Sequence, residues 1–218
     1  MNSPAAARPD ADWLRGRFER PLPYVPVATG DMPSVSMGLR PAAVLVPFVD
    51  RPEGLQILLT RRTAHLHDHA GQISFPGGRE EPDDGSSETT ALRETEEEIG
   101  LARERVQLLG RLSEYITVTG YRVTPVVGLV TPPFDLAPDE FEVAEIFEVP
   151  LAVLLDPDNH QRNTFVTRGM RRRYHAIPHG RHYIWGATAA MLLNLYSFLT
   201  VQATADERTP RSAPFSSA

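Results

Sequence analysis

The chain has 218 residues, which is enough for one compact domain with a sizeable core but cramped for two full domains. Its 41% hydrophobic and 23% charged residues suit a soluble globular protein, and no apolar run approaches the roughly 20 residues of a membrane span. The net charge of −6 argues against a nucleic-acid backbone as partner. Because the chain has no cysteine, disulfides, thiolate zinc sites and thiolate nucleophiles are excluded, and any metal must bind to oxygen or imidazole.

Both ends of the chain are rich in Ala, Ser and Pro, a composition that favours disorder. We expect disordered tails at residues 1–12 and 203–218 around a single domain at residues 13–202. The N-terminal segment has no apolar core of signal-peptide length and carries Asp10 and Asp12, which argues against secretion and against an organellar transit peptide. We therefore expect a cytoplasmic protein that does not contact a membrane.

The first half of the domain is predicted to consist mainly of strands. Residues 13–18 predict a short amphipathic helix, which the Pro-rich segment after them cannot continue. Two apolar runs, at residues 42–49 and 55–60, flank the turn-like segment 50–54 and predict a hairpin. Further strands are predicted at residues 72–75, 106–117 and 123–130.

The second half of the domain contributes helices. One helix is predicted to begin after Pro150, and residues 187–202 combine helix formers with apolar residues at helical spacing. Strands thus dominate the front and middle of the chain, and helices interrupt them. This pattern is typical of an α+β fold, or an α/β fold, in which a mixed sheet is flanked by helices.

Four glutamates occupy five consecutive positions of the segment ALRETEEEIGL, residues 91–101. Ser86 or Ser87 as N-cap and Gly100 at the C-terminal cap position predict a helix between them. Like charges three or four residues apart on a helix repel by about 0.2–0.5 kcal/mol per pair. The helix must therefore either present a solvated charged face or bind a divalent cation.

Helical spacing places Glu94, Glu97 and Glu98 on one face and directs Glu96 elsewhere. Three carboxylates on one face offer only oxygen ligands, which are the ligands that Mg²⁺ and Mn²⁺ prefer. Arg93 is adjacent and could orient a carboxylate. The spacing therefore predicts a Mg²⁺ or Mn²⁺ site on this helix.

The same segment resembles the Nudix box, GX5EX7REUXEEXGU, in which U is an aliphatic residue. Residues 93–101 match the second half of that motif, with Thr95 at an aliphatic position. In the first half, Asp84 replaces the glutamate six residues after Gly78, and eight residues rather than seven separate it from Arg93. The chain is thus identified as a member of the Nudix superfamily, which implies the α/β/α sandwich of the Nudix fold.

Upstream, residues 58–78 resemble LLTxR(S/A)x3Rx3Gx3FPGG, the signature of the coenzyme A pyrophosphatase branch of the Nudix hydrolases. Thr63 replaces Ser or Ala, and His67 stands in place of an arginine. The resemblance implies metal-dependent hydrolysis of coenzyme A or acyl-coenzyme A to 4′-phosphopantetheine and adenosine 3′,5′-bisphosphate. The alternatives are a pyrophosphatase acting on ADP-ribose, a dinucleotide or a nucleoside triphosphate, and a non-catalytic binding module of the same fold.

The resemblance also implies roles for four glutamates, three of which belong to the acidic helix. The carboxylates of Glu94, Glu97 and Glu98 would hold the Mg²⁺ or Mn²⁺ ions. Glu142 matches a downstream acidic residue that several Nudix enzymes use as general base, although it could equally be a solvated glutamate. Glu97 and Glu98 are the rival general bases.

Substrate contacts are implied for four residues of the upstream signature: Arg62, His67, Gly77 and Gly78. A basic run at residues 168–175 contains an arginine cluster that suits a 3′-phosphate, and a solvated hairpin is the alternative interpretation. Tyr183 and Trp185 could stack on an adenine or belong to the core. The sequence does not decide between a monomer and a homodimer.

Overall fold

The computed structural model describes residues 8–31, 38–66, 69–167 and 170–201. Most of both predicted tails falls outside these ranges, so the boundaries of tails and domain stay predictions. The first helix, α1 (Ala11–Glu19), begins two residues before the helix predicted at residues 13–18. It does so because the Asp10 carboxylate caps it, accepting a hydrogen bond of 2.8 Å from the Trp13 amide.

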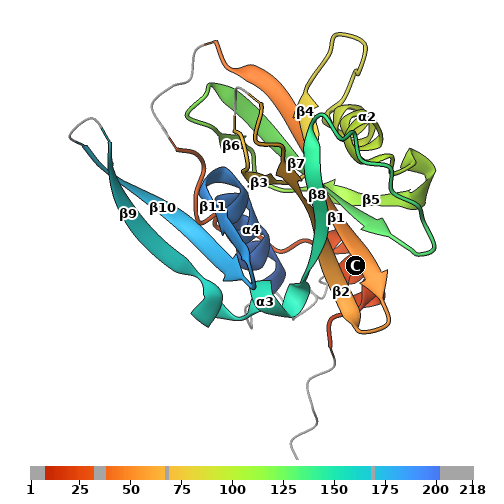
Figure 1. Ribbon diagram of the computed structural model, residues 1–218. Helices are drawn as coiled ribbons and strands as arrows, with labels where there is room; N and C mark the ends of the chain where they lie inside the picture. Colours follow the sequence, from red (N-terminus) through yellow and green to blue (C-terminus); the bar gives the residue numbers. More distant parts are fainter. Residues whose placement is uncertain (1–7, 32–37, 67–68, 168–169, 202–218) are drawn as a thin grey trace, which may run out of the picture.

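A mixed sheet forms the middle layer of the molecule (Figure 1). Its centre consists of β1 (Arg40–Arg51) and β2 (Gly54–Arg62), which form the predicted hairpin, and of β7 (Tyr121–Val130), which runs parallel to β1. The shorter strands are β3 (Ile73–Ser74), β4 (Gly77–Arg79), β5 (Val106–Arg111), β6 (Tyr115–Ile116) and β8 (Val143–Pro150). Across the described sheet the order is β3-β2-β1-β7-β5, and β4, β6 and β8 pair with β1, β7 and β2 respectively.

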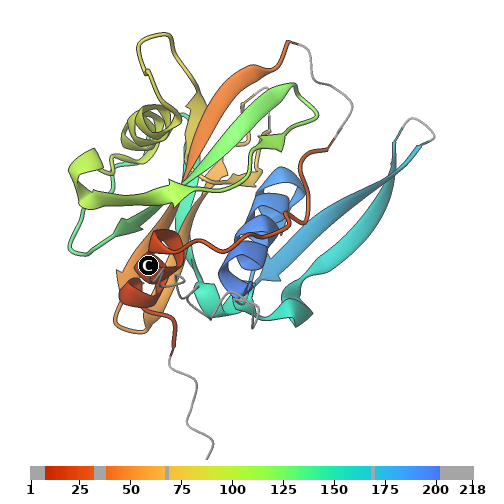
Figure 2. The ribbon, with the colours of Figure 1, turned by 180° about the vertical axis from the view of Figure 1, so that it is seen from behind.

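A second, antiparallel sheet extends to the left of Figure 1 and consists of β9 (Gln161–Thr167), β10 (Met170–His179) and β11 (His182–Trp185). The long helix α4 (Gly186–Thr200) packs against β10 and β11 and lies in front of β10 in Figure 2. Ten of its 15 residues are buried, because one hydrophobic core joins it both to this sheet and to the central sheet. A helix enclosed in this way must be apolar on nearly all sides.

Helices cover both faces of the central sheet. Along β1, Ala43 and Leu45 belong to the core beneath α2 (Ser87–Ile99), whereas Val46 and Phe48 belong to the core that contains α4. This division follows from the alternation of side chains along a strand. The expected α+β architecture, an α/β/α sandwich with a mixed sheet flanked by helices, is confirmed.

The predicted elements are mostly present, with two differences. A short helix, α3 (Leu151–Leu155), follows Pro150 as predicted, and α4 corresponds to the helix predicted at residues 187–202. The single strand predicted at residues 106–117 is wrong, because the chain leaves the ladder after Arg111 and rejoins β7 only at Tyr115. The prediction also lacked β4, β8 and the three strands of the second sheet. Single 3₁₀ turns are found at Arg103–Arg105 and Pro157–Asn159. In the described part of the chain, no helix is long and apolar enough to cross a membrane.

The Pro-rich arm after α1 crosses α4 (Figure 2) and is attached to it by a buried asparagine. The Asn194 side chain is 1% exposed and accepts a hydrogen bond from the Ala28 amide at 3.0 Å. Its own amide donates to the Ala28 carbonyl at 2.7 Å. One side chain thus satisfies both backbone polar groups of Ala28, a residue outside any strand.

Replacing Asn194 by Ala should lower the free energy of unfolding by about 2–3 kcal/mol, because two backbone groups would lose their partners in a buried site. Urea unfolding measures this, with the m-value expected to stay unchanged. The control is Ser197→Ala on the same helix, which removes an exposed hydrogen bond to the Val25 carbonyl and should cost well under half as much. Equal losses for the two variants would contradict the structural role of Asn194.

Candidate functional site

The acidic helix α2 has defined ends at the positions that the sequence indicates. The Ser86 hydroxyl accepts a hydrogen bond from the Thr89 amide at 3.2 Å and caps the N-terminus. Gly100 ends the helix in the left-handed conformation, at φ 69°, and a side chain at this position would meet the Ala137 backbone. Thr95, at the aliphatic position of the Nudix box, is fully buried and donates its hydroxyl to the Ala91 carbonyl at 2.6 Å. A threonine therefore fits this position without an unpaired polar group.

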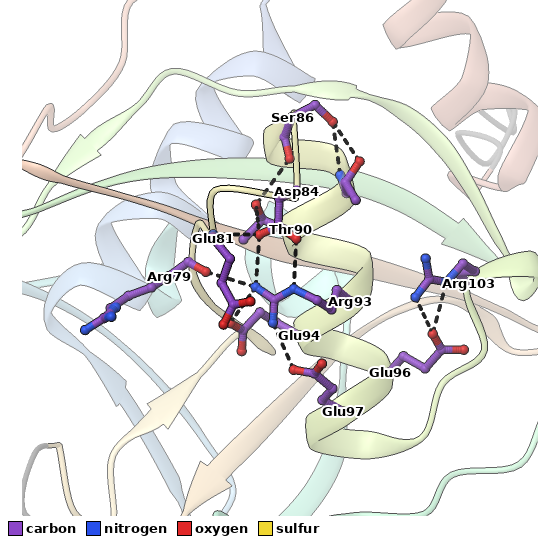
Figure 3. Close-up of polar contacts among 11 residues, drawn as sticks. Arg79, Glu81, Asp84, Ser86, Thr90, Arg93, Glu94, Glu96, Glu97 and Arg103 are labelled. Carbon is purple, nitrogen blue, oxygen red and sulfur yellow. Dashed lines mark hydrogen bonds and ion pairs between the residues drawn. The ribbon is translucent and has the colours of Figure 1, made fainter.

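One guanidinium group, that of Arg93, contacts a carboxylate of the loop before α2 and two glutamates of the helix (Figure 3). Arg93 donates two hydrogen bonds to Asp84, at 2.8 and 3.0 Å, and one to Glu97 at 2.9 Å. It also forms an ion pair with Glu94 at 3.1 Å. In this structure the repulsion among these carboxylates is thus offset by an arginine.

Asp84 anchors this arginine from the loop before α2. Its carboxylate is nearly buried and also accepts hydrogen bonds from the Thr90 hydroxyl at 2.9 Å and from the Glu81 amide at 2.8 Å. The hydrogen bonds from Arg93 hold the pKa of Asp84 well below its usual range. From the sequence Asp84 was only a departure from the Nudix box, and its role in positioning Arg93 was missed. Its place in the first half of that motif was the available signal.

The second group of acidic residues lies deeper, around Glu98. The Glu98 side chain is 7% exposed, accepts a hydrogen bond from the Gly77 amide at 3.1 Å and lies 3.4 Å from Arg62. Arg62 also reaches Glu142 at 3.5 Å and so connects the two carboxylates. Burial raises the pKa of Glu98 to about 7. Burial likewise raises the pKa of Glu94.

The two motif glycines allow the backbone to approach these carboxylates. Gly77 has a φ of 148° and pairs with Val44 of β1, where a Cβ atom would lie 2.4 Å from the Ala43 carbonyl oxygen. At Gly78 a Cβ atom would lie 2.4 Å from the carboxylate of Glu94. Any side chain at Gly78 would therefore displace Glu94.

The structure brings most of the predicted site residues together at one end of β2, β4, β8 and α2. They are Arg62, Gly77, Gly78, Arg93, Glu94, Glu97, Glu98 and Glu142. His67 lies outside the described residues. Glu96 points away and pairs with Arg103 at 2.7 Å, as its helical position predicts (Figure 3). Tyr183 and Trp185 are not core residues, because they are 43% and 41% exposed and line a separate cleft.

The donor set suits a hard divalent cation, because the acidic side chains offer only carboxylate oxygens. Among the residues that the structure describes, no group of three or more His, Asp or Glu side chains is arranged so that it could hold a metal ion as it stands. Arginines occupy the positions between these carboxylates instead, and Glu97 is 61% exposed. A metal site at Glu94, Glu97 and Glu98 therefore requires side-chain rearrangement and stays a prediction.

Comparison with known proteins agrees with this site. The NUDIX domain profile matches residues 39–168. A protein of Photorhabdus laumondii named "Uncharacterized Nudix hydrolase NudL" is 41% identical over 179 residues, which cover 82% of this chain and 92% of the relative. The chain therefore belongs to the Nudix hydrolase family. It is an enzyme of the diphosphatase type that acts on nucleoside diphosphate derivatives, and such hydrolases generally use divalent metal ions.

A Yersinia pestis protein of the same name is 39% identical over 179 residues, covering 82% of this chain and 89% of the relative. Among solved structures, the Nudix hydrolase RenU of M. smegmatis aligns with a TM-score of 0.44 at 24% identity, over 56% of this chain and 71% of that one. A MutT/nudix family protein of Enterococcus faecalis aligns with a TM-score of 0.46 at 17% identity, over 84% and 66%.

Replacing Asp84 by Asn should lower the free energy of unfolding by about 1.5–3 kcal/mol at pH 7, because Arg93 would lose its charged anchor. Because folding lowers the pKa of Asp84, its contribution is complete above about pH 4, the usual pKa of aspartate, and is lost as the pH falls further. The difference between wild type and variant should therefore shrink below pH 4. Urea unfolding at pH 7, 5 and 3.5 measures this.

The control for this experiment is Glu96→Gln, which breaks an exposed ion pair with Arg103 on the same helix. Such pairs contribute about 0–1 kcal/mol. A loss at Asp84→Asn no larger than at Glu96→Gln would contradict the anchoring role of Asp84.

Proposed function

We propose that this Nudix hydrolase cleaves the diphosphate linkage of coenzyme A or an acyl-coenzyme A to give 4′-phosphopantetheine and adenosine 3′,5′-bisphosphate. One observation carries this proposal. The segment that resembles the coenzyme A pyrophosphatase signature, residues 58–78, is directly joined to the Nudix helix, because its Arg62 and Gly77 both contact Glu98. These contacts support the proposal that signature and Nudix helix act as a single diphosphate-binding site.

We assign the metal ligands to Glu94, Glu97 and Glu98, with Mg²⁺ or Mn²⁺ as the ion. When bound, such ions neutralise the diphosphate oxygens and lower the pKa of an attacking water. The backbone constrains two of these proposed ligands, although the three side chains must still rearrange to hold an ion. The Gly77 amide fixes one oxygen of Glu98, and the backbone at Gly78 leaves space for the carboxylate of Glu94. Glu97 is held by Arg93, which Asp84 in turn holds in place.

We propose Glu142 as the general base that takes the proton of the attacking water. Its side chain is 41% exposed, so it can exchange that proton with solvent. Its negative charge acts on both Glu94 and Glu98, and this interaction supports a location within the acidic site. Arg62 bridges Glu142 and Glu98 and can release Glu142 when a polyanionic substrate competes for its guanidinium group. Glu97 and Glu98 remain the rival bases.

The other substrate candidates are ADP-ribose, a dinucleotide and a nucleoside triphosphate, and an assay separates them from coenzyme A. The purified protein with Mg²⁺ or Mn²⁺ should release 4′-phosphopantetheine and adenosine 3′,5′-bisphosphate from coenzyme A, as identified by mass. Its kcat/KM for coenzyme A should exceed that for ADP-ribose, NADH and nucleoside triphosphates. A higher kcat/KM for any of these three would refute the coenzyme A assignment and leave the diphosphatase chemistry intact.

Replacing Glu98 by Gln should reduce turnover by a factor on the order of 10²–10⁴, the loss typical of a catalytic group. The fold should persist, because burial already raises the pKa of Glu98 to about 7 and a neutral glutamine can accept the same hydrogen bond from Gly77. Millimolar Mg²⁺ or Mn²⁺ should raise the melting temperature of the wild type, since a ligand of the folded state stabilises it, and this rise should shrink in the variant.

Glu96→Gln is the matched control for this variant, since Glu96 belongs to the same helix and faces Arg103. It should retain both the turnover and the metal-induced rise in melting temperature. If Glu98→Gln kept the turnover of Glu96→Gln at saturating Mg²⁺, the assigned metal ligands would be wrong.

A further inference from the structure

A cleft of about 310 Å³ is lined by residues of β11 and of the loop before it, and by residues in or next to the strands β2, β3 and β8. Its lining residues are Arg61, Gly71, Ile73, Glu145, Arg181, His182, Tyr183 and Trp185. The cleft lies across β2 from the acidic site. Arg62 reaches Glu98 of α2, whereas its neighbour Arg61 pairs with Glu145 at 3.0 Å and lines the cleft.

The cleft carries an excess of positive charge in an otherwise acidic protein. Glu145 contacts three basic side chains, with Arg61 at 3.0 Å, His182 at 3.1 Å and Arg181 closer still. Burial alone would raise the pKa of Glu145, but the hydrogen bonds from His182 and Arg181 outweigh it, so the pKa is lowered. A single carboxylate thus faces two arginines. Arg181 is 78% exposed and is free to turn to an incoming anion.

Two exposed aromatic side chains lie next to the basic residues of the cleft. Tyr183 and Trp185 are two residues apart on β11 and flank the fully buried Ile184, so they share the outer face of the strand. Tyr174 packs edge-on against Trp185, with ring centroids 5.7 Å apart, and supports it from the neighbouring strand. Exposed aromatic rings beside a cationic cleft offer a stacking surface for a planar group that carries negative charge.

We propose that this cleft binds the adenosine 3′-phosphate end of coenzyme A, with the adenine against Trp185 and Tyr183 and the 3′-phosphate between Arg61 and Arg181. The inference rests on the proposed function. Arginines are suited to bidentate contacts with a phosphate, and aromatic side chains stack on a base. In coenzyme A one ribose separates the 3′-phosphate from the diphosphate. On β2, Arg61 lines the cleft and the next residue, Arg62, contacts the acidic site.

This assignment differs from the sequence-based expectation that the basic run at residues 168–175 binds the 3′-phosphate. Its described arginines, Arg171, Arg172 and Arg173, lie on β10, and none of them lines the cleft. The hairpin of β9 and β10 carries them, which agrees with the alternative of a solvated hairpin. Arg171 therefore provides a direct comparison with Arg61 and Arg181.

The chain has two tryptophans, so Trp13→Phe leaves Trp185 as the single fluorescent reporter. In that background, adenosine 3′,5′-bisphosphate should quench the fluorescence and bind at least tenfold more tightly than adenosine 5′-monophosphate. Arg61→Gln and Arg181→Gln should each weaken the bisphosphate roughly ten- to one-hundredfold and leave the monophosphate nearly unchanged, because each removes a charge-assisted contact to the 3′-phosphate. Melting temperatures identify any variant that fails to fold.

Arg122→Gln is the matched control, because Arg122 is an exposed arginine of β7 in a weak ion pair with Glu114, at 3.7 Å, and does not line the cleft. It should bind the bisphosphate like its parent. A loss of bisphosphate affinity in Arg171→Gln, with Arg61→Gln and Arg181→Gln unaffected, would move the 3′-phosphate to β10 and overturn the proposal. Bisphosphate binding without quenching of Trp185 would overturn the stacking role.

Measurements of turnover distinguish a failure of this proposal from a failure of the proposed function. If the wild-type protein hydrolysed coenzyme A and its 3′-dephospho form with equal kcat/KM, the proposed function would stand, but the cleft could not be the binding site of the 3′-phosphate. Wild-type protein that hydrolyses neither would refute the function, whatever the fluorescence shows. In the supported case Arg181→Gln raises KM for coenzyme A alone, and kcat stays near the wild-type value.

Discussion

The candidate site depends on the neutralisation of crowded carboxylates by two arginines. Arg93 offsets the negative charge of Asp84, in the loop before α2, and of Glu94 and Glu97 on the helix. Arg62 does the same between the buried Glu98 and the more exposed Glu142. Without these guanidinium groups, five acidic side chains would face one another with no counter-charge in a partly buried site, a cost that protein interiors do not sustain. A diphosphate and its metal ions would redistribute the same charges, with cations taking the carboxylates and arginines taking the phosphates.

The sheet provides the rigid support for this arrangement. The turn into β4 can lie against β1 only because Gly77 has no side chain, and this contact aims its amide at Glu98. On the other side, Ala91 and Ile99 fix α2 to the sheet through the core that they share with Leu45. The acidic face of the helix is therefore held between a packed core and a strand, which limits the distances that its carboxylates can adopt.

Short-range sequence patterns predicted much of the fold and of the acidic helix. The caps of α2 and the β1–β2 hairpin follow from patterns within a few residues, and the structure has both. Of the predicted face of glutamates, Glu98 is buried whereas Glu97 is exposed. What the sequence could not reveal depends on long-range pairing. The strand β8 is recognisable only beside β2, because its own residues mix acidic and apolar side chains. The strand β9 and the first half of β10 lack an alternating apolar face, and only the second half of β10 reaches the core, at Ala176 and Ile177. Likewise, the motif position of Asp84 could have marked it as a candidate residue, but its contact with Arg93 is recognisable only in the folded structure.

The parallel pairing of β1 with β7 has a consequence for the synthesis of this protein. β1 can complete its ladder only when Arg40 meets Tyr121 and Val49 meets Val130, so the whole segment between them must first leave the ribosome. During that interval the apolar hairpin of β1 and β2 has an open edge and two uncovered faces. Non-local pairing of this kind is slow and exposes aggregation-prone strands. One face of this hairpin stays uncovered longer still, because α4 at Gly186–Thr200 completes its core. Chaperone demand in the cell should therefore persist past residue 130, until residue 200 has been translated and released.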